Sequence, residues 1–158
     1  MRRVRPDDVP TVLRLVRELA AYEKAEHEAL MTADQLSAAL FGPSPALFGH
    51  VALDDGGEIA GFALWFLNFS TWRGTHGVYL EDLYVRPEHR GAGLGRELLR
   101  TLAAVCVERG YSRLEWSVLD WNAPSIEFYT AAGAVPMDEW TVFRLTDEPL
   151  ARFAADRR

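Results

Sequence analysis

Val85–Arg96, with the sequence VRPEHRGAGLGR, is the stretch of this chain that decides the fold. It leads from an apolar segment into an amphipathic one, and glycines occupy positions 91, 93 and 95. Because glycine has no Cβ, successive backbone N–H groups and a helix N-terminus can approach a bound anion closely. The stretch therefore predicts a strand, a phosphate-binding turn and a helix, with a phosphorylated cofactor as the ligand.

Two common phosphate-binding motifs do not match these glycines. A P-loop needs Lys-Ser or Lys-Thr after its last glycine, whereas Arg96 and Glu97 stand there. The dinucleotide motif G-x-G-x-x-G has a different spacing from glycines at every second residue. From the turn alone, an ordinary strand-to-helix connection with a glycine N-cap stays an open alternative.

The composition indicates one globular domain spanning residues 1–158. Apolar residues make up 49% of the chain and charged residues 25%, which is enough to enclose a sizeable core. No run approaches roughly 18 apolar residues and no leader pattern opens the chain, so we expect a cytoplasmic protein without a membrane partner. A net charge of -6 without a basic stripe argues against nucleic acid and fits a cationic substrate.

The sulfur and imidazole side chains do not suggest a metal site. Cys106 lies in an apolar run, where a buried thiol is the usual outcome. The four histidines are scattered without metal-ligand spacing, so none is assigned to a metal.

Apolar periodicity predicts an alternating order of elements. Two helices come first, one from the Asp7 and Asp8 caps to Tyr22 and one after a capping box that begins at Thr32. The remaining expected elements are strands at 50–53, 59–66, 78–85, 114–118 and 141–145, with helices at 94–109 and 125–132.

The strand expected at 78–85 carries two consecutive acids, Glu81 and Asp82, in an otherwise apolar run. An unpaired carboxylate in a central strand is costly, so these acids are candidates for a functional pair. Neighbouring strand residues face opposite ways, and only a β-bulge would turn both toward one cleft. A solvated edge strand is the alternative interpretation.

A second polar cluster follows the strand at 114–118. Asn122 can cap a helix with Pro124 in its first turn, and Ser125 and Tyr129 then share one face. Taken singly, Asn122 is favoured as a cap and Tyr129 as a packing residue.

Together the two clusters resemble a known family. Arg90-x-x-Gly93-x-Gly95, followed by Asn122-x-x-Ser125-x-x-x-Tyr129, is similar to the GNAT acetyltransferases. The segments 18–23, 79–82 and 121–129 and the Trp72 loop resemble its diamine (spermidine/spermine) acetyltransferase branch, and the likeness runs from about residue 4 to 145. It implies an α/β (α+β) GNAT fold in a homodimer, with a mixed, mostly antiparallel sheet of six to seven strands, a splayed central pair and about four helices.

The resemblance also implies a reaction, in which an acetyl group passes from acetyl-CoA directly to a primary amine of a small molecule. Tyr129 matches the general acid, and the backbone N–H of Leu83 would polarise the thioester carbonyl. The implied cofactor-binding residues are Leu83, Tyr84, Val85, Arg90, Gly91, Ala92, Gly93, Leu94, Gly95, Arg96, Asn122, Ser125 and Tyr129.

The amine poses a protonation problem. With a pKa of ~10.4, only about one amine in a few thousand is neutral at pH 7. Glu81, acting through water, is the predicted base. An acidic and aromatic groove for the ammonium form is expected from Tyr22, Glu23, Trp72, Glu81 and Asp82.

The chain departs from the polyamine-acetylating pattern at three positions. Ser70 replaces an acid, Arg73 adds a positive charge beside Trp72, and Ala131 replaces a basic residue after Tyr129. These changes fit a shorter amine with its own carboxylate, such as thialysine, at least as well as a polyamine. They also leave Arg90, Arg96 or Arg100 to meet the outer phosphate of the cofactor.

Two other functions stay open at this point. One is acetylation of a protein lysine or N-terminus, and the other is a non-catalytic acyl-CoA-binding module. The presence of both Glu81 and Tyr129 argues against the second, because a pure binder needs neither a base nor an acid.

Overall fold

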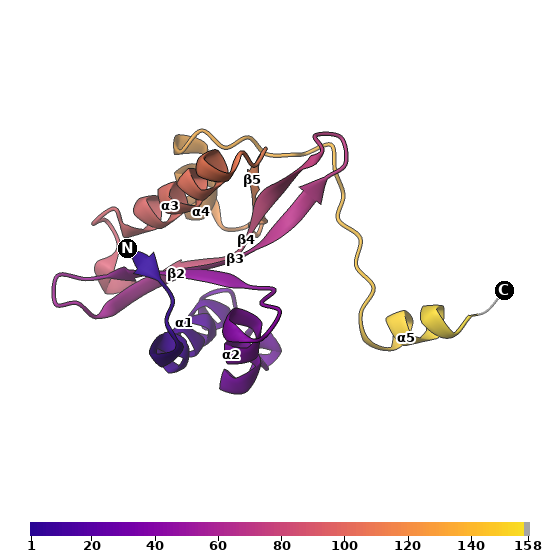
Figure 1. Cartoon of the computed structure of the whole chain (residues 1–158), viewed down its shortest axis with the longest axis horizontal. Coiled ribbons are helices and arrows are strands. Elements are labelled where there is room, and N and C mark those ends of the chain that lie inside the picture. The colour runs from indigo at the N-terminus through magenta and orange to yellow at the C-terminus, as the bar shows by residue number, and fades with distance from the viewer. Residues whose placement is uncertain (157–158) are drawn as a thin grey trace. The chain divides into compact units, whose positions relative to one another are not determined.

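The structure is a computed structural model that describes residues 1–156 (Figure 1). The chain divides into two compact units, Met1–Leu119 and a second unit that begins at Asp120. The first unit holds, in chain order, β1 (Arg2–Arg3), α1 (Val9–Tyr22), α2 (Ala33–Phe41), β2 (Phe48–Leu53), β3 (Ile59–Ser70), β4 (Thr75–Val85), α3 (Leu94–Arg109) and β5 (Leu114–Glu115). The second holds α4 (Ala123–Ala131) and α5 (Asp147–Ala155).

The sheet of the first unit has the strand order β1-β2-β3-β4-β5. The first three pairings are antiparallel, and β4 and β5 are parallel. Pairing between β4 and β5 is confined to Val78↔Leu114 and Tyr79↔Glu115. From Leu80 onward, the edge of β4 that faces β5 therefore has no ladder partner among the described strands, which is the expected splay.

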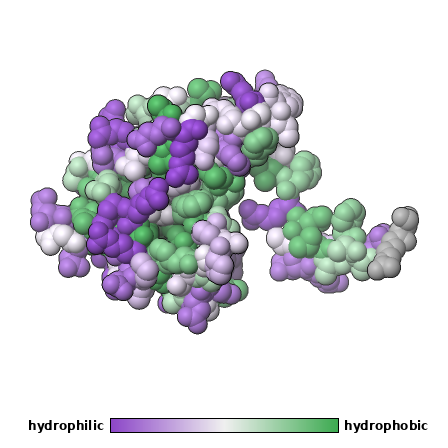
Figure 2. Space-filling view, viewed as in Figure 1, coloured by the Kyte–Doolittle hydropathy of each residue, from purple (hydrophilic) through white to green (hydrophobic). Residues whose placement is uncertain are grey.

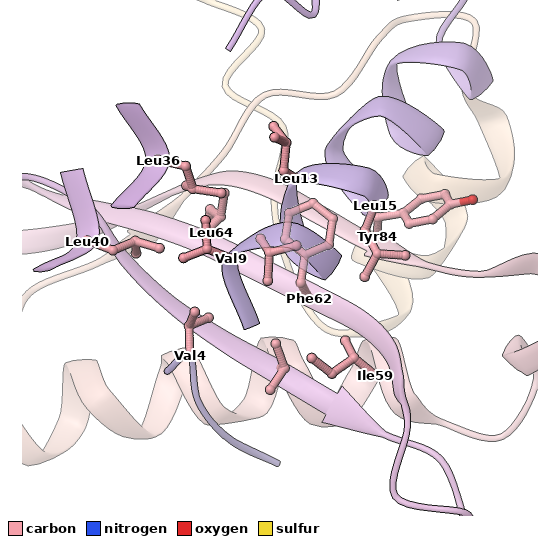
Figure 3. Close-up of a cluster of buried hydrophobic side chains, with 12 residues drawn as sticks. Val4, Val9, Leu13, Leu15, Leu36, Leu40, Ile59, Phe62, Leu64 and Tyr84 are labelled. Atoms are coloured by element: carbon pink, nitrogen blue, oxygen red, sulfur yellow. The ribbon is translucent and has the colours of Figure 1, made fainter. Parts of the chain in front are cut away.

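The core lies on both faces of this sheet. Figure 1 shows α1 and α2 below it and α3 above it. Val12, Leu15 and Phe62 are fully buried on the α1 face, as is Leu102 on the α3 side. Figure 3 shows the ring of Phe62 among side chains from α1 and β4. Burying an aliphatic or aromatic side chain of this size contributes about 1.5–3 kcal/mol, so these contacts fix both helix layers on the sheet.

Of the helix caps predicted from the sequence, the one at α2 is present and the Asp8 cap at α1 is not. At α2, the Thr32 hydroxyl accepts from the Gln35 N–H at 3.3 Å and the Gln35 side chain accepts from the Thr32 N–H at 2.9 Å, which confirms the capping box. At α1, Asp8 gives no side-chain cap. Its carboxylate accepts from the Arg5 N–H and from the Arg2 guanidinium instead, and these donors occupy both of its oxygens.

The strand expected at 141–145 is wrong. Residues 132–146 form no strand in the structure, and α5 follows them, so the described sheet has five strands instead of six to seven and the described α-helices number five. A lone strand leaves its backbone donors and acceptors unpaired, and the second unit has no other strand among its described residues to pair with it. The strand expected at 114–118 is also shorter, since only Leu114–Glu115 pair with β4.

Candidate active site

The glycine turn opens α3 in the way that the sequence predicts. Gly91 and Gly93 have φ angles of +84° and +83°, a conformation that side chains with a Cβ rarely adopt. A Cβ added at either position would meet no atom within 4 Å. Gly93 is the N-cap of α3, and no side chain caps the helix there. The N-terminal N–H groups of α3 therefore begin at an open surface that can receive an anion.

β4, the strand that leads to this turn, can contact a ligand through its backbone. Tyr84 is 6% exposed, and its ring packs in the α1-face core (Figure 3). Val85 is also buried and Leu83 is half-buried. Tyr84 can therefore contact a ligand through its backbone alone, along the edge of β4 that β5 leaves unpaired.

The two acids of β4 lie at a break in the strand register. Leu64 pairs with Asp82, but the next residue of β3, Trp65, pairs with Leu80. Glu81 is therefore the extra residue of a β-bulge and has no partner across the ladder. A bulge redirects one side chain of a consecutive pair, which is the condition under which both carboxylates can serve one site. Glu81 is exposed and Asp82 is half-buried.

The carboxyl group of Asp82 lies within the electrostatic reach of two others, Glu81 beside it on β4 and Glu23 at the end of α1. Burial first, and then the negative charges of Glu81 and Glu23, raise the pKa of Asp82 to about 7. Burial also raises the pKa of Glu23. We name Glu23, Glu81 and Asp82 the acid cluster. Because like charges and desolvation both oppose ionisation, a bound cation would relieve the cluster by restoring a counter-charge.

The proposed substrate residues are not all brought together. Tyr22 ends α1 and is followed directly by Glu23 of the acid cluster. Trp72 lies instead in the β3–β4 turn, beyond the last ladder pair Ser70↔Thr75, and is 89% exposed. Along an extended strand, the seven residues from Thr75 to Asp82 span about 20 Å. Within one chain, the structure therefore keeps Trp72 away from the acid cluster.

Arg90 has contacts that the sequence did not suggest. Its Nε–H donates to the Val85 carbonyl at 2.8 Å, and its guanidinium lies over the rings of Tyr22 and Tyr84. Arg86, four residues earlier, holds Glu18 of α1. The sequence did contain one signal for these contacts. Arg86 and Arg90 are four residues apart, and so are Glu18 and Tyr22.

The remaining predicted residues lie in the second unit. Asn122 is buried, and its side-chain oxygen accepts from the Ser125 N–H at 3.4 Å, so Asn122 caps α4. Ser125 and Tyr129 are four residues apart on α4 and share one of its faces. Tyr129 is partly exposed and packs beside the ring of Phe128.

Residues 1–156 contain neither a membrane-spanning helix nor a candidate metal cluster. No helix in this part of the chain combines the length and apolar character needed to cross a bilayer. No group of three or more histidine, cysteine, aspartate or glutamate side chains there could hold a metal ion.

A parallel strand pair that stops after two residue pairs, beside a glycine turn at a helix N-terminus, is an arrangement suited to a phosphorylated ligand. The family model described as the acetyltransferase (GNAT) family matches residues 13–134. The chain belongs to this family, and it is an acetyltransferase.

Individual proteins support the same assignment. Thialysine N-epsilon-acetyltransferase from Bos taurus is 37% identical over 98% of this chain and 96% of its own length. Spermidine/spermine N(1)-acetyltransferase-like protein 1 from Homo sapiens is 32% identical over 98% of this chain and 23% of its own length. An integron cassette protein from the mobile metagenome of V. cholerae has the same fold, with a TM-score of 0.81 at 23% identity over 98% of this chain and 96% of that one. These findings confirm the resemblance and the fold class predicted from the sequence.

Proposed function

We propose that this protein transfers the acetyl group of acetyl-CoA to a primary amine of a small molecule. The observation that carries the proposal is the acid cluster, in which the charges of Glu81 on β4 and of Glu23 at the end of α1 both act on Asp82, on the strand that leads to the glycine turn. A positively charged amine is the ligand that such a cluster favours. The glycine turn and the free edge of β4 fit a coenzyme A diphosphate and pantetheine.

The residues divide the chemistry between proton transfer and charge stabilisation. Glu81, the exposed member of the acid cluster, takes a proton from the ammonium group through water and leaves a nitrogen lone pair to form the new C–N bond. The backbone N–H of Leu83 stabilises the negative charge that develops on the thioester oxygen. Tyr129 donates its phenolic proton to the sulfur as the C–S bond breaks. Bound acetyl-CoA supplies the activated acyl group.

The substrate class follows from the charges near the acid cluster. Glu23, Glu81 and Asp82 bind the ammonium form of the amine, and Tyr22 packs against its alkyl carbons. Ser70 and Arg73 reduce the negative charge of the β3–β4 turn, which only a second copy of the chain could bring to the acid cluster, and this favours a short amine that carries its own carboxylate over a long polycation. A relative that acts on thialysine supports this preference.

The proposal includes a cytoplasmic homodimer. Large apolar side chains between α4 and α5 are more than half exposed, among them Val135, Trp140 and Phe143. A second copy of the chain is the occupant proposed for them, in line with the family resemblance. A second copy would also offer its exposed Trp72 to surfaces that the same chain cannot reach.

A panel of acceptors tests the function. Spermidine, putrescine, thialysine, lysine and a lysine-containing peptide are assayed for thiol release from acetyl-CoA. We expect turnover with the small amines, and most with those that carry a carboxylate. Turnover confined to the peptide would show a protein acetyltransferase, and CoA binding without turnover would show a non-catalytic module.

The Tyr129→Phe variant tests the general acid in the same assay. Loss of the phenolic proton should lower kcat by about ten- to ten-thousand-fold, with little change in CoA affinity. Tyr111→Phe is the matched control, because Tyr111 lies between α3 and β5 and packs against His76. Full activity of Tyr129→Phe would remove Tyr129 from the mechanism.

A further inference from the structure

Two arginines in the segment between β4 and α3 hold two residues of α1. The arginines, Arg86 and Arg90, are four residues apart, and so are their contacts, Glu18 and Tyr22. Residues four apart on a helix lie one above the other on the same face. The segment that ends at the glycine turn is therefore tied to one face of α1 at two successive turns.

The first tie is an ion pair. Arg86 donates from Nε to one Glu18 oxygen at 3.1 Å and from a terminal nitrogen to the other at 2.9 Å. Both side chains are less than one-third exposed. A two-pronged arginine–carboxylate pair of this kind fixes orientation as well as distance. The Glu18 partner also raises the pKa of Arg86, so the pair stays charged.

The second tie connects three elements through one side chain. The Cζ atom of Arg90 is 5.1 Å from the ring centre of Tyr22 and 5.6 Å from that of Tyr84. Its Nε–H is already donated to the carbonyl of Val85. A planar guanidinium suits this arrangement, because it stacks on aromatic rings while its edge donates hydrogen bonds.

The two ends of the second tie lie next to the two halves of the proposed site. Arg90 directly precedes Gly91, the first positive-φ residue of the glycine turn. Tyr22 directly precedes Glu23, whose charge acts on Asp82 in the acid cluster. One side chain, Arg90, thus spans the distance between the surface for the diphosphate and the surface for the amine.

We infer that Arg90 is a positioning residue that links the glycine turn to the acid cluster, so that coenzyme A bound at the turn fixes Tyr22 and Glu23 for the amine. The inference rests on the proposed function. A diphosphate held by residues 91–96 restrains the backbone from which Arg90 extends, and the guanidinium then restrains the end of α1. By thermodynamic reciprocity, an amine at the acid cluster should likewise strengthen CoA binding.

This role differs from the expectation that Arg90 binds a phosphate of the cofactor. A phosphate ligand would have its guanidinium turned toward the anion, and its loss would weaken CoA binding most. A positioning residue would affect the amine most, since CoA would still bind the backbone N–H groups of the turn. The two roles therefore predict opposite divisions between the KM for the amine and the affinity for CoA.

Hydrogen–deuterium exchange with CoA as the probe tests the link without any amine. In the wild-type protein, CoA should slow exchange at residues 91–96 and also at residues 19–23. In Arg90→Met, we expect slowing at 91–96 alone. Arg109→Met is the matched control, because Arg109 lies over Tyr111 at the other end of α3 and should leave both responses intact.

Variants of Tyr22 test the same contact from α1. Tyr22→Leu removes the ring beneath Arg90 and should abolish the response at residues 19–23, whereas Tyr22→Phe keeps the ring and should retain it. In steady-state assays with the best amine of the panel, Arg90→Met should raise the amine KM about tenfold, the scale of losing a cation–π contact and a hydrogen bond. CoA affinity should change by less than about threefold.

The outcomes separate this inference from the proposed function. Slowing at 91–96 without slowing at 19–23 in the wild-type protein overturns the link and leaves the cofactor site intact. A large loss of CoA affinity in Arg90→Met with an unchanged amine KM also overturns it, in favour of phosphate binding. No slowing at 91–96 in the wild-type protein overturns the proposed function as well.

Discussion

Asp82 has a carboxyl group whose protonation changes near neutral pH. Its pKa is raised from 3.8 to about 7, first by burial and then by Glu81 and Glu23. Between pH 4 and pH 7, the unfolded chain releases this proton while the native state keeps it. The resulting stabilisation is present at low pH and is lost as the pH rises through 7, a difference of about 2–4 kcal/mol.

Asp82→Asn should remove this contribution. We expect the variant to lose less free energy of unfolding than the wild type between pH 4 and pH 8, measured by urea denaturation at several pH values. Asp55→Asn, at an exposed acid of the β2–β3 turn, is the control and should behave as the wild type does. Parallel curves for Asp82→Asn and the wild type would mean that the pKa of Asp82 is the same in the native and unfolded states.

His50 gives the opposite pH dependence. It is 6% exposed, and its Nδ1 accepts a hydrogen bond from the Trp65 indole N–H at 3.2 Å, which only an unprotonated nitrogen can do. Burial first, and then the positive charge of Arg3, lower the pKa of His50 to about 4. Below pH 6.5 the unfolded chain gains a proton that the native state does not, so stability falls by about 3 kcal/mol as the pH drops toward 4.

The His50→Gln variant isolates the contribution of His50 to the loss of stability in acid, because a glutamine oxygen can accept the hydrogen bond from Trp65 without titrating. Thermal unfolding from pH 7 to pH 4.5 should show a smaller loss in the variant than in the wild type. His27→Gln, at an exposed histidine, serves as the comparison. A loss in His50→Gln equal to that of the wild type would assign the acid sensitivity to other groups.

At the scale of elements, one glycine stands at each end of α3. Comparing substitutions at the two distinguishes backbone strain from loss of ligand binding. Gly93 precedes the helix with φ +83° and Gly110 ends it with φ +65°, and neither faces an atom within 4 Å of an added Cβ. Alanine at either position should destabilise the protein by about 1 kcal/mol, because an L-residue with a Cβ resists this conformation. Only Gly93→Ala should also weaken CoA binding in calorimetry, since its methyl group would face the diphosphate. Equal CoA affinity in both variants would remove the turn from the cofactor site.

The same elements show how much of the structure the sequence could predict. The turn at 91–95, α3 and the Thr32 capping box follow from local chemistry, because glycine and hydroxyl side chains act on their own backbone. From the sequence, the bulge at Glu81 could be named only as what both acids would need in order to face one cleft. Its presence depends on the register with the opposite strand, β3. The contacts of Arg90 join α1 to β4 across more than sixty residues of sequence, and no local rule predicts them.

At the scale of the whole molecule, the segment after α4 explains the wrong strand at 141–145. Its apolar residues alternate with polar ones only weakly, and Val142 and Phe143 are 80% and 92% exposed. Periodicity reports which residues favour burial, but a strand also needs a neighbouring strand for its hydrogen bonds. The second unit provides none among its described residues, so the pattern alone could not decide the element.

The homodimer gives the last prediction, and it concerns this same segment. Phe143→Glu places a charge on a nearly fully exposed apolar position, and a charge buried between two subunits is costly. We expect the wild-type protein to sediment with twice the 17.8 kDa mass of one chain and Phe143→Glu to sediment as a monomer. Val107→Glu, at an 81% exposed valine of α3, is the matched control and should stay dimeric. If Phe143→Glu keeps the wild-type mass, or if the wild type itself sediments as a monomer, the segment around Phe143 is not the surface that joins two copies.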